Sequence, residues 1–173
     1  MGRAPATSPP TNSLHYLQCH LGLLCLFDGV TAMLKRRIDA GKRYVFKTHI
    51  NDILLPREEA EVIEAFRVVI EPGKYTHAHV HEDTEQLYCV ISGEGRAIYT
   101  SVSGVQTEFT MAPGEVVHVP RNIRHQIFCT SAEEPLIYLC VDGFPLGKPQ
   151  NEPTWDSHYE AVMQLPSQQP EAR

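Results

Sequence analysis

The sequence predicts an all-β domain, either a sandwich or a barrel, and three observations indicate it. The chain has 173 residues, which suits one domain with its own core. From Tyr44 onward, short runs rich in Val, Ile, Phe and Tyr follow one another. Turn-forming residues separate these runs, as at Glu71–Gly73 and Ala112–Gly114. We therefore expect many short strands with regular turns between them.

The expected elements follow directly from these runs, because each run is bounded by a turn or a proline. The expected strands cover residues 44–47, 65–71, 77–81, 86–91, 95–100, 107–111, 115–119, 125–130 and 136–141. A short helix is expected over residues 56–61, where Pro56 suits the first helical position. A second helix is expected over residues 155–163 of the polar tail.

Composition divides the chain into three parts. Residues 1–40 are expected to be an N-terminal extension that is partly disordered, because its start is rich in Pro, Ser and Thr, with a short helical segment after residue 14. Residues 41–145 are expected to form the β-domain, and residues 146–173 a tail with a short helix and a frayed end. One hypothesis is that translation begins at Met33, which the intact mass of the native protein tests.

Charge and cysteine usage exclude several classes of protein. The net charge is −6, and the 15 Lys and Arg residues form no block, so nucleic acid is not an expected partner. The apolar stretch over residues 21–27 is too short to span a membrane and is a poor signal peptide. The five cysteines are odd in number and form no CxxC pair, which favours a reduced, cytoplasmic protein.

Three histidines stand at alternate positions in the stretch HAHVH, namely His77, His79 and His81. Alternate residues of a strand share one face, so a regular strand would point these imidazoles the same way. Imidazole nitrogen is a preferred ligand of divalent transition metals. A solvated face is the alternative interpretation of the three histidines.

The spacing around these histidines matches the first of two motifs that are characteristic of one protein superfamily. Five residues separate Gly73 from His79, and His81 follows with one residue between. Four residues then lead to Gln86, and six more lead to Gly93.

A second stretch, GEVVHVPRNIRH, matches the second motif. Five residues separate Gly114 from Pro120, Asn122 comes two positions later, and two residues then lead to His125. With both motifs, the segment from residue 65 to residue 141 resembles the cupin superfamily. The resemblance implies a double-stranded β-helix, also called a jelly-roll barrel, here with short helical segments at its N- and C-terminal ends.

The resemblance also implies a site for one divalent transition metal: Fe(II), Mn, Ni, Zn or Cu. The positions that correspond to the ligands are His79, His81, Gln86 and His125. Glu85 is the alternative to Gln86, because the family places a glutamate at this point with variable spacing. Two further positions depart from the motif, where Asn122 replaces a glycine and Cys129 replaces an asparagine. Asparagine still tolerates the left-handed conformation of a turn.

Strand alternation places further side chains near the expected metal. The expected substrate pocket is lined by Tyr88, Val90, Ile127, Cys129 and, at its mouth, His77. Such a largely apolar lining is usual for small-molecule sites. His77 is either a gating or proton-relaying group or simply a solvated residue.

The expected function is that of a metal-dependent enzyme acting on a small anionic or enolisable molecule. Oxygenation and isomerisation or cyclisation are the expected chemistries, because a metal polarises substrate oxygens and stabilises developing negative charge. The alternative is a non-catalytic module that binds a small acid or sugar as a sensor or carrier. A homodimer is expected by analogy with the superfamily and from the need to cover sheet edges.

Overall fold

The computed structural model describes residues 33–165, and the chain divides into two units after Arg36. Within the described range, the second unit contains every strand and the helix. The elements are β1 Lys42–Val45, β2 Ile50–Leu55, β3 Ile63–Ile70, β4 Glu85–Ser92, β5 Gly95–Thr100, β6 Gln106–Met111, β7 Val116–Val119, β8 Arg124–Cys129, β9 Leu136–Gly143 and α1 Trp155–Gln164.

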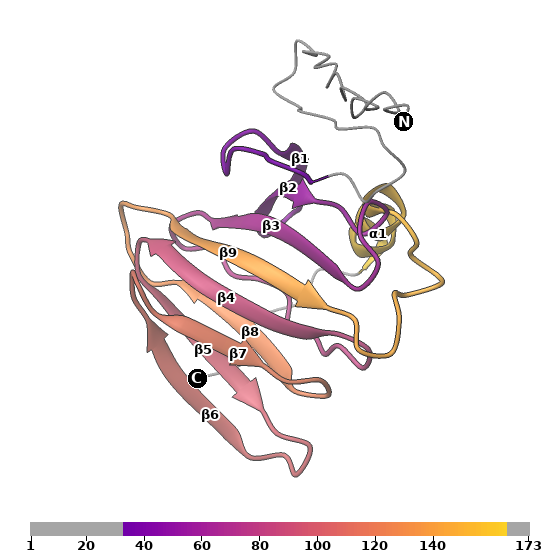
Figure 1. The fold of residues 1–173 in the computed structure, drawn as a ribbon. Coiled ribbons are helices and arrows are strands. Elements are labelled where there is room, and N and C mark those ends of the chain that lie inside the picture. The colour runs from indigo at the N-terminus through magenta and orange to yellow at the C-terminus, as the bar shows by residue number, and fades with distance from the viewer. Residues whose placement is uncertain (1–32, 166–173) are drawn as a thin grey trace, which may run out of the picture. The chain divides into compact units, whose positions relative to one another are not determined.

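Two antiparallel sheets make up the β-domain (Figure 1). The larger sheet has the strand order β1-β2-β3-β9-β4-β7, and the smaller one has the order β6-β5-β8. Buried side chains alternate along β3 and β9, as expected for strands with one face on a core. The all-β, jelly-roll prediction is confirmed.

The structure corrects three of the expected elements and adds a strand. Residues 77–81 are not a regular strand; they form an extended loop that runs along β8 and pairs with it through isolated bridges. Residues 56–61, expected as a helix, contain only a turn. In that turn the amide of Glu59 donates a hydrogen bond to the carbonyl of Pro56 at 3.0 Å. Strand β2 was not expected. The N-terminal helical segment is absent from residues 33–41, and the rest of that prediction lies outside the described residues.

A row of polar side chains crosses the inner face of the larger sheet at one end. Glu64 of β3 lies opposite Asp142 of β9, and Asp142 lies opposite Gln86 of β4. All three are buried. The next row inward consists of Phe66, Cys140 and Tyr88, so the core becomes apolar within one step. Buried polar groups require partners, so this row marks one end of the barrel interior as a site for polar contacts.

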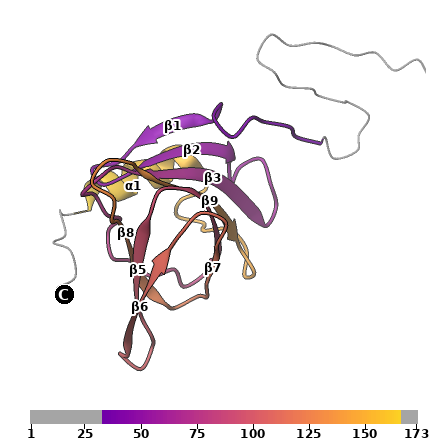
Figure 2. The same ribbon diagram turned by 90° about the vertical axis from the view of Figure 1, so that its left-hand side faces the viewer.

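Helix α1 packs against the inner side of β1 and β3 (Figure 2). Its start is fixed by a capping box between Thr154 and Ser157. Trp155 at the first position is 1% exposed and contacts Phe66 edge-on, with ring centres 4.8 Å apart. Burial of this indole anchors the helix over the polar end of the barrel.

No helix in the described part of the chain has the length and apolar character needed to cross a membrane.

Candidate metal centre

The backbone brings His79 and His125 together, although they lie 46 positions apart in the chain. The amide of His79 donates to the carbonyl of His125 at 3.0 Å, and the amide of His125 donates back at 2.8 Å. This reciprocal pair of bonds makes the two residues direct partners in an antiparallel pairing. The loop and β8 therefore hold the two imidazoles side by side.

His81 is positioned by the turn that precedes β8. The amide of Asn122 donates to the carbonyl of His81 at 2.7 Å. Asn122 has a positive φ of 62°, the left-handed conformation expected from its place in the motif. The turn thus carries the chain into β8 and fixes the loop residue next to it.

These contacts produce a compact group of three imidazoles. The nearest ligand nitrogens of His79, His81 and His125 all lie within 4.8 Å of one another. The ring centres are 4.3 Å apart for His79 and His125 and 4.8 Å apart for His79 and His81. Because imidazole nitrogens bind a metal at ~2.0–2.1 Å, two ligand nitrogens of one ion lie at most ~4.2 Å apart, so the three rings need to close by only a fraction of an ångström to hold one ion.

Backbone carbonyls set the tautomer of two of the imidazoles. Nδ1 of His79 lies 2.6 Å from the carbonyl oxygen of His77, and Nδ1 of His125 lies 3.0 Å from that of Ile123. Because a carbonyl only accepts hydrogen bonds, each Nδ1 carries the proton and each Nε2 presents a lone pair. Such contacts are the usual outer shell of metal-binding histidines.

Two local features indicate that a cation fits among the three imidazoles. Nε2 of His81 is buried and has no hydrogen-bond partner. The Tyr88 hydroxyl lies 2.6 Å from Oε1 of Gln86 and 3.1 Å from Nε2 of His125, so its single proton faces two acceptors. A bound cation would satisfy both the free His81 nitrogen and the excess of lone pairs.

Burial keeps the three imidazoles in the form that binds metals. Burial lowers the pKa of His81 to about 3 and places that of His125 well below its usual range. Burial also lowers the pKa of His79, although its bond to the His77 carbonyl opposes that shift. The rings are therefore neutral near pH 7, as metal binding requires.

The structure separates the two candidates for the fourth ligand position. Gln86 is buried in the cavity wall, where its Nε2 donates to Oδ1 of Asp142 at 3.0 Å. That contact turns Oε1 toward Tyr88 and the histidines. Glu85 is exposed on the opposite face of β4, with its carboxylate 3.6 Å from Nε2 of His118. Glu85 therefore points away from the three imidazoles.

A buried acid network lies behind Gln86. Arg57 donates from Nε and Nη2 to the two carboxylate oxygens of Glu64 at 2.8 and 2.9 Å. Glu64 lies across the sheet from Asp142, and Cys140 donates to Oδ1 of Asp142 at 3.0 Å. Burial, with the neighbouring charge of Glu64 as the second cause, raises the pKa of Asp142 to about 8. A proton held on Asp142 relieves the repulsion between the two acids.

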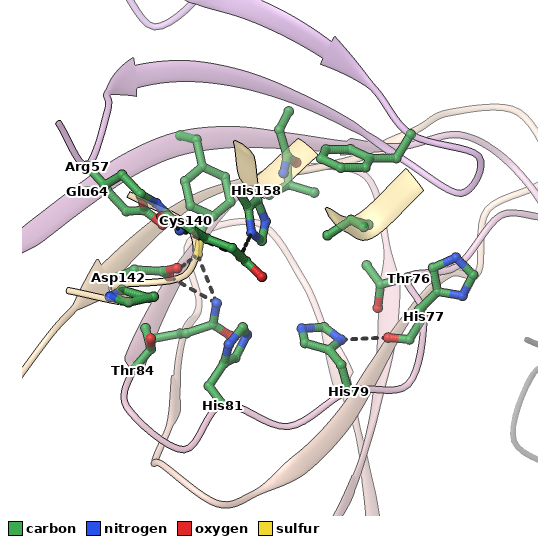
Figure 3. Close-up of a pocket in the computed structure, with 18 of the residues that line it drawn as sticks. Arg57, Glu64, Thr76, His77, His79, His81, Thr84, Cys140, Asp142 and His158 are labelled. Carbon is green, nitrogen blue, oxygen red and sulfur yellow. Dashed lines mark hydrogen bonds and ion pairs between the residues drawn. The ribbon is translucent and has the colours of Figure 1, made fainter. Parts of the chain in front are cut away.

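Two of the three histidines, His79 and His81, border a cavity of about 320 Å³ that the polar row and residues of α1 also line (Figure 3). His79 and His81 lie on one side of it, and His158 of α1 lies across from them. Nδ1 of His158 contacts Oε2 of Glu152 at 2.6 Å, and this hydrogen bond lowers the pKa of Glu152. The cavity therefore contains a histidine oriented by a carboxylate, in addition to the imidazoles of His79 and His81.

The expected pocket residues divide into two groups. Tyr88, Ile127 and His77 line the cavity, and His77 is buried rather than solvated. Val90 and Cys129 belong to the hydrophobic core and do not line this cavity.

Sequence reasoning missed several polar residues of the cavity, including Arg57, Glu64, Asp142, Glu152 and His158. A signal existed for two of them. Glu64 and Asp142 occupy inward positions of otherwise apolar alternating strands, which marks a buried polar site. Glu152 and His158 lie beyond the motifs, in a polar tail whose docking could not be anticipated.

The Gln86 position gives a direct test of the fourth ligand. Gln86→Ala is expected to weaken metal affinity by about 10- to 100-fold, because it removes Oε1 and frees Tyr88 and Asp142 from their contacts. Glu85→Ala is expected to leave affinity unchanged, since Glu85 faces outward. Competition titration against a chromogenic chelator measures both. Loss of metal only in Glu85→Ala would reverse the assignment.

Comparison with known proteins agrees with the motif analysis. Residues 66–142 match a family model described as a cupin domain. The chain is 28% identical to a glucose-6-phosphate isomerase of Pyrococcus horikoshii, over 62% of this chain and 68% of that protein. It is 30% identical to an auxin-binding protein of Nicotiana tabacum, over 60% of this chain and 58% of that protein. The resemblance drawn from the two motifs is confirmed.

Solved structures support the same fold. An oxalate decarboxylase of Lactobacillus farciminis, solved as a formate complex, aligns with a TM-score of 0.57 and 22% identity. The alignment covers 76% of this chain but 43% of the decarboxylase chain, so this chain spans less than half of that protein. At this identity, the likeness shows the fold alone.

Proposed function

We propose that this chain, in which residues 66–142 form a cupin domain, is a metal-dependent isomerase of a small hydroxy-carbonyl compound. The observation that carries the proposal is the group of three neutral imidazoles whose ligand nitrogens lie within 4.8 Å of one another beside a polar cavity. The relative named a glucose-6-phosphate isomerase favours isomerisation over the other chemistries expected from the sequence. A divalent ion bound by the imidazoles supplies polarisation of the substrate's carbonyl oxygen.

His158 is the proposed proton carrier. Its Nδ1 faces the carboxylate of Glu152, which leaves Nε2 as the basic nitrogen. Nε2 accepts the proton from the carbon beside the carbonyl and returns it to the former carbonyl carbon. The hydroxyl proton moves to the former carbonyl oxygen, so that no atom is gained or lost overall.

Glu152 acts as a positioning residue for His158. Its carboxylate holds the imidazole in one tautomer and stabilises the positive charge that the ring gains with the proton. Helix α1 encloses this pair, because Trp155 anchors the helix on the barrel.

Deuterium exchange tests this function. The full chain, loaded separately with Fe(II), Mn(II), Ni(II) and Zn(II), is incubated in D₂O with aldoses and ketoses, each with and without a phosphate ester. Interconversion with deuterium incorporation beside the carbonyl is expected by NMR. His158→Gln is expected to reduce kcat by about 10²- to 10⁴-fold while metal content is retained.

His118→Gln is the matched control, since His118 lies on the outward face of β7 and is expected to leave the rate unchanged. Absence of exchange with every metal and sugar would reject the isomerase. Oxygen consumption in aerobic samples would instead favour oxygenation.

One observation favours a second candidate function, a non-catalytic binder. Gln86 stands at the position where the motif has a glutamate, and a neutral amide is a weaker ligand than a carboxylate. The relative named an auxin-binding protein is consistent with binding without turnover. Tight ligand binding with no chemical change, under the conditions of the exchange assay, would establish this alternative.

A further inference from the structure

Unsatisfied polar atoms gather around a single cavity. Among the described residues, four buried side-chain atoms have no hydrogen-bond partner: Oδ1 of Asn51, Nδ1 of His77, Nε2 of His81 and Nε1 of Trp155. All four residues line the cavity beside the metal centre. Buried polar groups normally have partners, so a group of exceptions in one place requires an explanation. A metal explains His81 and leaves the other three atoms without a partner.

Two of the remaining three atoms, those of Asn51 and Trp155, require partners of opposite kinds. The amide oxygen of Asn51 accepts hydrogen bonds, whereas the indole nitrogen of Trp155 only donates. Asn51 lies on β2 and Trp155 on α1, so different elements contribute the two groups. A hydroxyl group both donates and accepts, and a ligand that carries several hydroxyls can satisfy both atoms at once.

No Lys or Arg side chain among the described lining residues of the cavity is available to an anionic group. Arg57 is the only Lys or Arg among the described residues that line it. Its Nε and Nη2 donate to Glu64, and its Nη1 donates to the carbonyl of Glu152 at 2.8 Å. The guanidinium is thus held by protein partners at all three nitrogens, and its charge is balanced by Glu64.

Acidic groups outnumber the positive charges around the cavity. Five carboxyl groups line it, those of Glu64, Glu82, Asp83, Asp142 and Glu152. Even with Asp142 protonated, the remaining carboxylates outweigh Arg57 and a divalent ion together. A phosphate dianion placed here would meet a net negative lining, and no Lys or Arg side chain is available to pair with it.

We propose that the cavity binds an uncharged, polyhydroxylated small molecule, such as a free sugar, and selects against its phosphate ester. The inference rests on the proposed function, because it takes the cavity of the proposed isomerase as the substrate site. Asn51 accepts from one ligand hydroxyl, and the indole of Trp155 donates to another. The carboxylates that line the cavity favour hydroxyl donors and repel phosphate.

Calorimetry with a matched pair of probes tests the selection. The full chain, both Zn(II)-loaded and metal-free, is titrated with fructose and with fructose 6-phosphate. Fructose is expected to bind at least about tenfold more tightly, since the ester lacks a countercharge. Equal binding of the two probes, tighter binding of the ester, or no binding of fructose at millimolar concentrations would overturn the proposal.

Two variants test the named contacts. Asn51→Ala is expected to weaken fructose binding about tenfold, and Trp155→Phe is expected to weaken it while keeping an aromatic ring in the core. Gln150→Ala is the control, because Gln150 is exposed and contacts only the carbonyl of Lys148. Unchanged fructose binding in both test variants, with retained melting temperatures, would contradict the assignment.

The outcome is separable from that of the isomerase proposal. Binding of fructose without any exchange in D₂O would leave the inference standing and remove the isomerase. Isomerisation of fructose 6-phosphate without binding of fructose would support the isomerase and overturn the inference about ligand selection.

Discussion

Replacing His81 with alanine is expected to reduce metal affinity by more than about 100-fold, beyond what the loss of an outer-shell contact costs. His81 supplies one of three imidazoles within 4.8 Å, and its Nε2 has no protein partner that competes with a metal. Elemental analysis after dialysis against a weak chelator measures the loss. His118→Ala, on the outward face of β7, is expected to keep the wild-type metal content.

The His81→Ala variant also distinguishes a metal-binding role of His81 from a structural one. In metal-free protein, His81→Ala is expected to melt at or above the wild-type temperature, because it removes a buried nitrogen without a partner from the wall of an existing cavity. Added metal is expected to stabilise the wild type by about 2.7 kcal/mol at a hundredfold excess over the wild-type Kd, and the variant by less than about 0.4 kcal/mol. A metal-free variant that melts far below the wild type would make His81 a structural residue.

The fold and the three histidines could be predicted because both follow from local signals. Turn residues fix the strand boundaries, and the spacing from Gly114 to His125 places an imidazole at the start of β8. The partner segment was expected as a strand, and this was wrong because it pairs with β8 only through isolated bridges. His79 still faces His125, since one reciprocal pair of backbone bonds is sufficient to fix their positions.

The rest of the site depends on pairings that are distant in sequence. Glu64, Asp142 and Gln86 form one row only because β9 lies between β3 and β4, and no local pattern specifies that strand order. Strand β2 was missed because Asn51 and Asp52 are turn-forming residues in isolation. In the structure, Asp52 is held by Arg43 and Arg67 from the two neighbouring strands, which a single strand's sequence does not reveal.

Replacing Arg57 with alanine is expected to cost about 3–5 kcal/mol of unfolding free energy, because it leaves Glu64 buried without its partner. Both side chains are almost fully buried, at 4% and 1% exposure. Arg57 also lies over the Trp155 ring at 5.5 Å, so its loss weakens the anchoring of α1 as well. Chemical denaturation measures the change. Arg37→Ala is the control, since the Arg37–Asp39 pair is exposed and is expected to contribute nothing measurable.

A double variant distinguishes the uncompensated charge from the lost packing. Arg57→Met combined with Glu64→Leu removes both charges and keeps apolar volume, so it is expected to recover most of the stability that Arg57→Ala loses. The double variant also leaves Asp142 without its acidic neighbour, which removes one of the causes that raise the pKa of Asp142. If the double variant were as unstable as Arg57→Ala, the loss would come from the contacts of Arg57 with Trp155 and the Glu152 carbonyl rather than from the charge on Glu64.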